Sequence, residues 1–130
     1  MHGTETDHAR HPLIVLVEEE TMEREVFAEY LESTGFAVLD AADTDMGLAL
    51  LEANGGVRGL VTDAHVPGQI DGCELAQVAC ARWPHLAVVM MSGHSDATSG
   101  PVPAGGVFIS KPYLLQHLAP TLSRMIASRV

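Results

Sequence analysis

Four short apolar runs in this chain end in residues that can do chemistry. The first run ends in three glutamates at positions 18–20, the second in Asp63 and the third in Ser92, while Lys111, the only lysine, follows the fourth. If these runs are parallel strands of one sheet, their carboxyl ends share an edge, where ligands bind in open α/β sheets. We therefore expect the four groups to be neighbours in space.

The chemistry that these residue types favour is phosphoryl transfer beside a metal ion. Glu18, Glu19 and Asp63 would bring several carboxylates together, and like charges so close require a cation. Oxygen ligands without converging Cys or His favour a hard ion, Mg²⁺ or Mn²⁺. One carboxylate can also act as a nucleophile, as in aspartyl-phosphate chemistry. A phosphoryl group on Asp63 would then meet the metal, the charge of Lys111 and the hydroxyl of Ser92.

The elements that must position these groups follow from the hydrophobic pattern. Apolar runs alternate with helix-period segments, and this βαβαβαβαβα order predicts a doubly wound α/β fold with a five-stranded parallel sheet between helix layers, a flavodoxin-like three-layer sandwich. The predicted strands cover residues 13–17, 36–40, 58–63, 86–91 and 106–110, and the predicted helices comprise one that ends at Gly35 and three at about residues 43–54, 71–83 and 113–128.

The spacing of apolar residues predicts which helix faces are buried. The predicted inward residues are Met22, Val26, Phe27, Tyr30 and Leu31 in the first helix, Met46, Ala49, Leu50 and Ala53 in the second, and Leu114, Leu118, Leu122, Met125 and Ile126 in the last. Between residues 94 and 106, where a further helix is due, prolines and glycines are concentrated. We expect a shortened or irregular fourth helix there, with at most about one turn.

Composition limits the class of protein. The 130 residues, 47% hydrophobic, predict one domain with its own core and leave no room for a fused output domain. A net charge of −10 would repel nucleic acid and anionic membranes. The N-terminus is too polar for a signal peptide, no apolar run reaches the ~20 residues of a membrane helix, and Cys73 and Cys80 are too far apart on a helix for a disulfide. We expect a cytoplasmic protein that binds neither nucleic acid nor membrane.

Four motifs, in order, make the sequence resemble the receiver domain of two-component response regulators over about residues 12–128. They are the acids in VLVEEE, the segment VTDAHVPGQIDG around Asp63, the hydroxyl motif MSGH and KPY after the last strand. The resemblance implies a stand-alone, CheY-like receiver domain at residues 13–130 behind an N-terminal tail at residues 1–12. It further implies a signalling protein rather than an enzyme, present as a monomer or weak homodimer.

The resemblance also implies roles for individual residues. Asp63 would accept a phosphoryl group from the histidine of a sensor kinase or of a histidine phosphotransfer protein, with Lys111 as the phosphate-binding lysine. Glu18, Glu19 and the backbone carbonyl of His65 would complete the Mg²⁺ ligands with Asp63.

Two further residues take positions that respond to phosphorylation in the family. Ser92 stands at the switch hydroxyl. Phe108 takes the position of the aromatic side chain that turns inward on activation.

The sequence departs from the family pattern at points that bear on function. Glu19 stands where the family usually has aspartate, which predicts weak metal binding, and PGQIDG is one residue longer than the common PGMDG. A pseudo-receiver that binds a partner without phosphorylation is therefore the alternative. A flavodoxin-like mononucleotide binder is disfavoured, because three glutamates after the first strand would repel phosphate.

Overall fold

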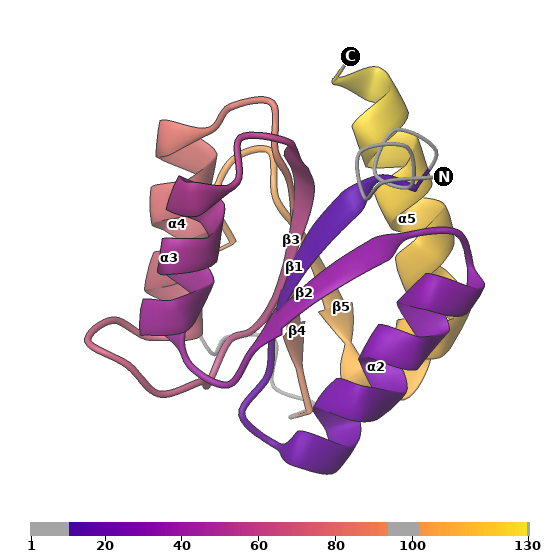
Figure 1. The fold of residues 1–130 in the computed structure, drawn as a ribbon, viewed down its shortest axis with the longest axis horizontal. Coiled ribbons are helices and arrows are strands. Elements are labelled where there is room, and N and C mark those ends of the chain that lie inside the picture. The colour runs from indigo at the N-terminus through magenta and orange to yellow at the C-terminus, as the bar shows by residue number, and fades with distance from the viewer. Residues whose placement is uncertain (1–10, 94–101, 130) are drawn as a thin grey trace, which may run out of the picture.

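The computed structural model describes residues 11–93 and 102–129, which form a parallel sheet between two layers of helices (Figure 1). The sheet has five strands in the order β2-β1-β3-β4-β5. Helices α3 and α4 cover one face, and α2 and α5 cover the other (Figure 1). This arrangement confirms the doubly wound α/β fold.

The strands are β1 (Leu13–Val17), β2 (Ala37–Ala41), β3 (Val57–Asp63), β4 (Ala87–Ser92) and β5 (Val107–Ser110). The helices are α2 (Thr21–Ser33), α3 (Thr44–Ala53), α4 (Gly72–Arg82) and α5 (Leu114–Ser128), and the 3-10 turn η1 (Lys111–Tyr113) precedes α5.

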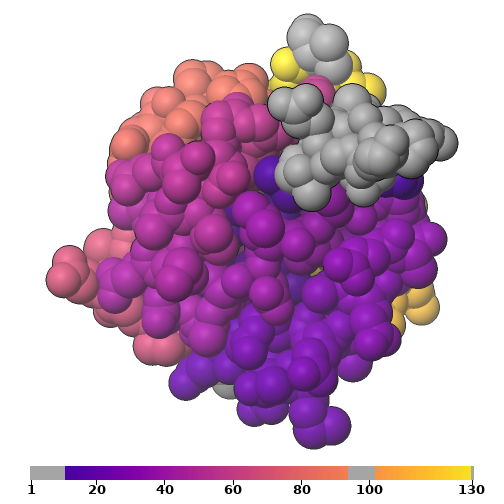
Figure 2. Space-filling view, viewed as in Figure 1, coloured from indigo at the N-terminus to yellow at the C-terminus, as the bar shows by residue number. Residues whose placement is uncertain are grey.

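The core is split by the sheet into two apolar clusters. Every residue of β1 is buried, and alternate side chains point to opposite faces. Val15 and Val17 pack with the cluster beneath α3 and α4, whereas Ile14 and Leu16 pack with the cluster beneath α2 and α5. Burial on both faces explains why β1 is uniformly apolar instead of alternating. In the space-filling view, α2, β2 and α3 form most of the surface on this side (Figure 2).

Polar caps set the start of two helices close to the site. Asp71 accepts a hydrogen bond from the Glu74 amide at 2.8 Å, and the Glu74 carboxylate accepts one from the Asp71 amide at 3.0 Å, so α4 begins with a reciprocal capping box. Asp43 caps α3 by accepting from the Met46 amide at 2.8 Å. These caps fix where the connections from β2 and β3 end.

The predicted buried face is confirmed for α5 and wrong for much of α3. All five predicted residues of α5 are buried. In α3 the buried residues are instead Thr44, Gly47 and Leu51, whereas Met46 is 51% exposed and Ala49 and Ala53 are exposed. A Cβ at Gly47 would lie 2.7 Å from Cγ2 of Val17, so the helix approaches the sheet through its smallest residue. Leu50 is half-buried and packs against the core as predicted, but the prediction followed apolar residues alone and therefore missed Thr44 and Gly47.

The prediction for α2 was wrong for Met22 and Val26. Phe27 and Leu31 are buried and Tyr30 is half-buried, but Met22 and Val26 are 73% and 50% exposed. Met22 belongs to the first turn of α2, which extends beyond the apolar cluster covered by the rest of the helix.

The connection between β4 and β5 is described only in part. The predicted fourth helix falls mainly on residues 94–101, which lie outside the described residues, as do residues 1–10 of the predicted N-terminal tail. Residues 102–106 form a turn, in which the Gly106 amide donates to the Pro103 carbonyl at 2.9 Å and Gly105 has a φ of +88°. In the part of the chain that the structure describes, no helix has both the length and the hydrophobicity to cross a membrane.

Candidate functional site

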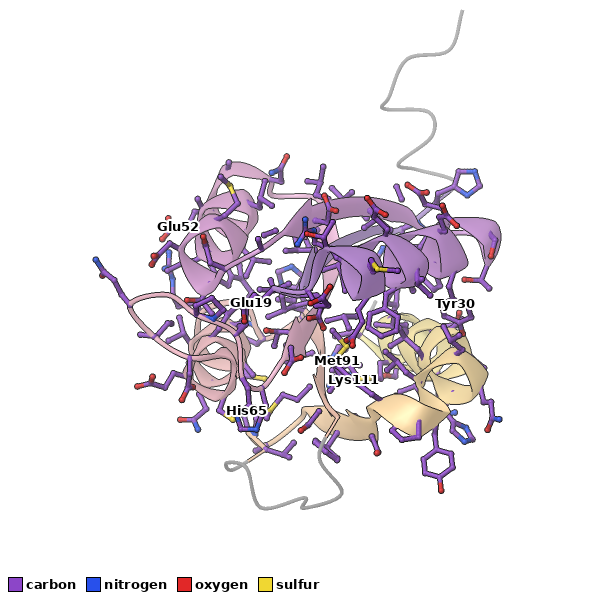
Figure 3. The ribbon with its side chains drawn as sticks, turned by 90° about the horizontal axis from the view of Figure 1, so that it is seen from below. Glu19, Tyr30, Glu52, His65, Met91 and Lys111 are labelled. Atoms are coloured by element: carbon purple, nitrogen blue, oxygen red, sulfur yellow. The ribbon has the colours of Figure 1, made fainter. Side chains whose placement is uncertain are left out.

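The polar residues singled out in the sequence gather at the carboxyl edge of the sheet, onto which Figure 3 looks. Asp63 and Ser92 are the last residues of β3 and β4, Glu18 follows β1, and Lys111 follows β5. Because β1, β3, β4 and β5 are consecutive in the sheet, these four residues come from adjacent strands. The edge is the place where an open parallel sheet leaves a crevice for ligands.

Lys111 is the centre of a charge cluster. Its Nζ lies 2.6 Å from Oδ2 of Asp63, 2.9 Å from Oε1 of Glu18 and 2.6 Å from Oε1 of Glu23. Two of these carboxylates were expected at the site. Glu23, in the first turn of α2, was not predicted as a site residue.

Burial strengthens the electrostatic interactions within this cluster. Glu18 and Asp63 are 2% and 8% exposed, so their charges are largely removed from water. Burial acts to lower the pKa of Lys111, but the close contacts with the Asp63, Glu23 and Glu18 carboxylates outweigh it and hold the pKa above its ordinary value. The ammonium therefore stays charged at neutral pH. Burial raises the pKa of Glu18, opposed by the Glu20 amide and by Lys111.

Asp63 is held at both of its carboxylate oxygens. Oδ1 accepts a hydrogen bond from the His65 amide at 2.8 Å, while Oδ2 faces Lys111. The Ala64 amide donates to the Met91 carbonyl at 2.8 Å, which ties the end of β3 to β4. A fixed carboxylate beside an ammonium is suited to receive an electrophile whose oxygens carry negative charge.

Ser92 and His65 differ in their accessibility. Ser92 is fully buried at the end of β4, whereas the His65 side chain is exposed on the loop after β3. The role expected of His65 involves only its backbone carbonyl, so exposure of the imidazole is compatible with that role.

The acids after β1 divide into an inner and an outer residue. Glu18 is buried and its amide continues the sheet by donating to the Ala41 carbonyl at 3.0 Å, whereas Glu19 is exposed. Arg24 donates to the carbonyls of Glu18 and Glu19 at 2.9 and 3.2 Å, which holds the backbone of this turn. The sequence alone did not distinguish the two glutamates.

The donor set fits a hard cation. Oε1 of Glu18 is buried and forms an ion pair with Lys111 without a well-oriented hydrogen bond, which leaves an acceptor for a cation. Glu18 and Asp63 supply the oxygen ligands that Mg²⁺ prefers. Within residues 11–93 and 102–129, however, no three acidic, His or Cys side chains are arranged so that they could already hold a metal ion. Carbonyl and water ligands would have to complete the coordination.

Phe108 lies on the edge strand β5, half-buried, and packs against the cluster beneath α3 and α4. It also contributes to an open groove of about 470 Å³ on the β5 and α5 side. The groove is lined by Val107, Phe108, Ile109, Ser110, Tyr113, His117 and Thr121. Phe108 therefore contacts both the core and an accessible surface.

Replacing Lys111 with methionine is expected to destabilise the metal-free protein at neutral pH by about 2 kcal/mol. The change leaves Glu18 and Asp63 buried without their shared cation, and the loss is moderated by solvent screening because Lys111 is 17% exposed. Urea denaturation with and without Mg²⁺ measures the effect, and Mg²⁺ should stabilise the variant more than the wild type. The control is Arg82→Met, which breaks an exposed pair with Glu52. Equal losses of stability in both variants would show that Lys111 does not stabilise the buried Glu18 and Asp63 carboxylates.

A comparison with known protein families identifies the response regulator receiver domain, whose model matches residues 14–122. The sensor kinase CckA of Brucella abortus is 29% identical over 93% of this chain, and the transcriptional regulatory protein FixJ of Azorhizobium caulinodans is 36% identical over 75% of it. The chain spans 13% and 47% of the length of these two relatives.

Solved structures with the same fold include single receiver domains. The receiver domain of the hybrid histidine kinase CckA is 31% identical, with a TM-score of 0.73, and the match covers 88% of this chain and 98% of that one. A response regulator receiver protein from Sinorhizobium medicae has a TM-score of 0.81 at 24% identity, with 92% and 98% covered.

Proposed function

Because the chain belongs to the response regulator receiver domain family, we propose that Asp63 accepts a phosphoryl group from a phosphohistidine and that the resulting change is relayed by protein–protein contact. The observation that carries this proposal is the contact between the buried Asp63 carboxylate and Lys111 at 2.6 Å. An anionic nucleophile beside a fixed ammonium can take on a phosphoryl group whose added charge is already balanced in part.

The proposed step transfers one phosphoryl group without a change of oxidation state. A carboxylate oxygen of Asp63 forms a bond to phosphorus while the bond between phosphorus and the donor imidazole nitrogen breaks. The electron pair of the broken bond stays on that nitrogen, which takes up a proton. Lys111 would neutralise a phosphoryl oxygen, and the Ser92 hydroxyl would donate a hydrogen bond to another.

Mg²⁺ is the cofactor that we propose for this site. Glu18, Glu19, Asp63 and the backbone carbonyl of His65 would hold it, and the ion would supply charge neutralisation for the transferred group. The exposed position of Glu19 leaves its side chain free to reorient toward the ion. Fixing this side chain on the ion costs conformational entropy, so we expect weak affinity for Mg²⁺.

The partner that we propose is a sensor histidine kinase or a histidine phosphotransfer protein. The similarity to the sensor kinase CckA and to the receiver domain of the hybrid histidine kinase CckA supports a kinase-linked pathway. The side chains of Ser92 and Phe108 would change position on phosphorylation. Phe108 could pass this change to the surface, since it lies between the core and the groove on the β5 and α5 side. The partner protein would recognise that surface in the cytoplasm.

The alternative function is a phosphorylation-independent interaction module. It is favoured by one observation, the lack of a preassembled three-ligand cluster in the described residues. The two functions differ in whether the site accepts phosphate, so the same experiment separates them.

Incubation with acetyl phosphate and Mg²⁺ is expected to add one phosphoryl group to the protein, and chelation with EDTA is expected to prevent it. Intact-mass spectrometry measures the gain, with a phosphorylated histidine kinase as a second donor. Absence of any gain from both donors, with the fold intact by circular dichroism, would favour the interaction module and refute the proposal.

A further inference from the structure

The contact between Glu23 and Lys111 links α2 to the end of β5 across 88 residues of sequence. Lys111 Nζ donates to Oε1 of Glu23 at 2.6 Å, as close as its contact with Asp63. Glu23 lies in the first turn of α2, separate from the acids that follow β1. None of the chemistry described above assigns it a role.

An ammonium group has three N–H donors, and three carboxylates surround Lys111. These carboxylates occupy the space around the ammonium before any phosphoryl group arrives. A phosphoryl oxygen can reach this ammonium only if one of the existing contacts is given up. The proposed transfer thus requires Lys111 to exchange a partner.

The three carboxylates differ in the free energy that it costs to separate each of them from Lys111. The side chain of Glu23 is 46% exposed, compared with 3% for Glu18 and 11% for Asp63. Release of Glu23 returns its carboxylate to water, whereas release of Glu18 would leave a buried charge without its cation. We therefore expect the contact between Glu23 and Lys111 to be the one that breaks.

We propose that Glu23 is a positioning residue that holds the Lys111 ammonium in the unphosphorylated protein and releases it when Asp63 is phosphorylated. The inference rests on the proposed function. An interaction that is present in the starting state and lost in the product opposes the reaction. Glu23 therefore slows phosphoryl acceptance and weakens binding of phosphoryl mimics, and its removal frees Lys111 for the incoming group.

The test compares the wild type, Glu23→Gln and Glu25→Gln. Gln keeps the size of the side chain, and Glu25 is an exposed acid on the same helix that has no described contact with Lys111. Both variants remove one negative charge, so the comparison separates the specific contact from general repulsion of anionic donors. Urea denaturation of each protein establishes that the fold is kept.

The first measurement is the initial rate of the mass gain from acetyl phosphate at saturating Mg²⁺. In this reaction an Asp63 oxygen forms the bond to phosphorus and acetate leaves with the electron pair of the broken bond. We expect Glu23→Gln to react about three to five times faster than the wild type, the effect of losing one half-exposed ion pair. Glu25→Gln should react at the wild-type rate.

The second measurement is the affinity for beryllofluoride, which imitates the phosphoryl group without covalent transfer. Glu23→Gln should bind it about three to five times more tightly, because the same contact is lost on binding. A purely structural contact would change the unfolding midpoint and leave both the rate and this affinity unchanged.

Each other outcome overturns the inference. If Glu23→Gln reacts at the wild-type rate or more slowly, Glu23 does not restrain Lys111. If Glu25→Gln is accelerated equally, the effect is general charge repulsion. If the wild type gains no phosphoryl group, the proposed function and this inference both fail. If the wild type is phosphorylated and Glu23→Gln reacts at the same rate, only the role of Glu23 is rejected.

Discussion

The Asp63→Asn variant is expected to lose phosphoryl acceptance completely under conditions in which the wild type gains one group. An amide has no carboxylate oxygen to attack phosphorus, and no other described carboxylate combines burial with both the Lys111 contact and the His65 amide. The expected effect is therefore all-or-none. Intact-mass spectrometry after treatment with acetyl phosphate and Mg²⁺ measures it.

The matched control for this variant is Asp40→Asn. Asp40 lies in β2, is exposed, and pairs with Arg24 at 3.4 Å, so its loss makes the same change in net charge at the edge of the same sheet. This control should accept phosphate at the wild-type level. A wild-type mass gain in Asp63→Asn would show that the acceptor is another residue.

The Gly72→Ala variant is expected to be destabilised by about 3 kcal/mol, a large effect for a single added methyl group. A Cβ at position 72 would overlap the carbonyl oxygen of Asp63 and lie 3.0 Å from the carbonyl carbon of Ala64. Both neighbours are backbone atoms, so the clash can be relieved only by moving the start of α4 away from the end of β3. Such a shift would also displace Asp63 and reduce phosphoryl acceptance.

Urea denaturation compares this variant with Gly56→Ala, which is the control because a Cβ at Gly56 would meet no atom within 4 Å. Gly56→Ala should unfold close to the wild-type midpoint. Equal midpoints for Gly72→Ala and Gly56→Ala would show that α4 does not pack on the Asp63 backbone as described.

The ends of the strands could be predicted from the sequence because their signals are local. Uniformly apolar runs identify strands that are buried on both faces, and in a parallel sheet the residues after them must share an edge. Asp63, Ser92 and Lys111 lie at these ends as expected. The same reasoning identified α5, whose apolar residues are large and regularly spaced.

Residues whose importance depends on tertiary packing could not be predicted in this way. Glu23 is one of several glutamates in α2 and resembles a solvent-facing acid until Lys111, 88 residues away, is placed beside it. The inward residues Thr44 and Gly47 give no hydrophobic signal. Thr44 is buried because it donates to the Ile70 carbonyl at 2.6 Å, a contact set by the fold of the loop after β3.

Chemical identification of the phosphorylated residue in the unaltered chain tests directly whether Asp63 is the acceptor. Borohydride reduces an aspartyl phosphate to homoserine and leaves free carboxylates intact, so peptide mapping after phosphorylation and reduction locates the acceptor. Homoserine is expected at position 63 alone, formed only when donor and Mg²⁺ are both present. Homoserine at Asp40 or Asp71, or a phosphoryl group retained on His65 with Asp63 unmodified, would contradict this expectation.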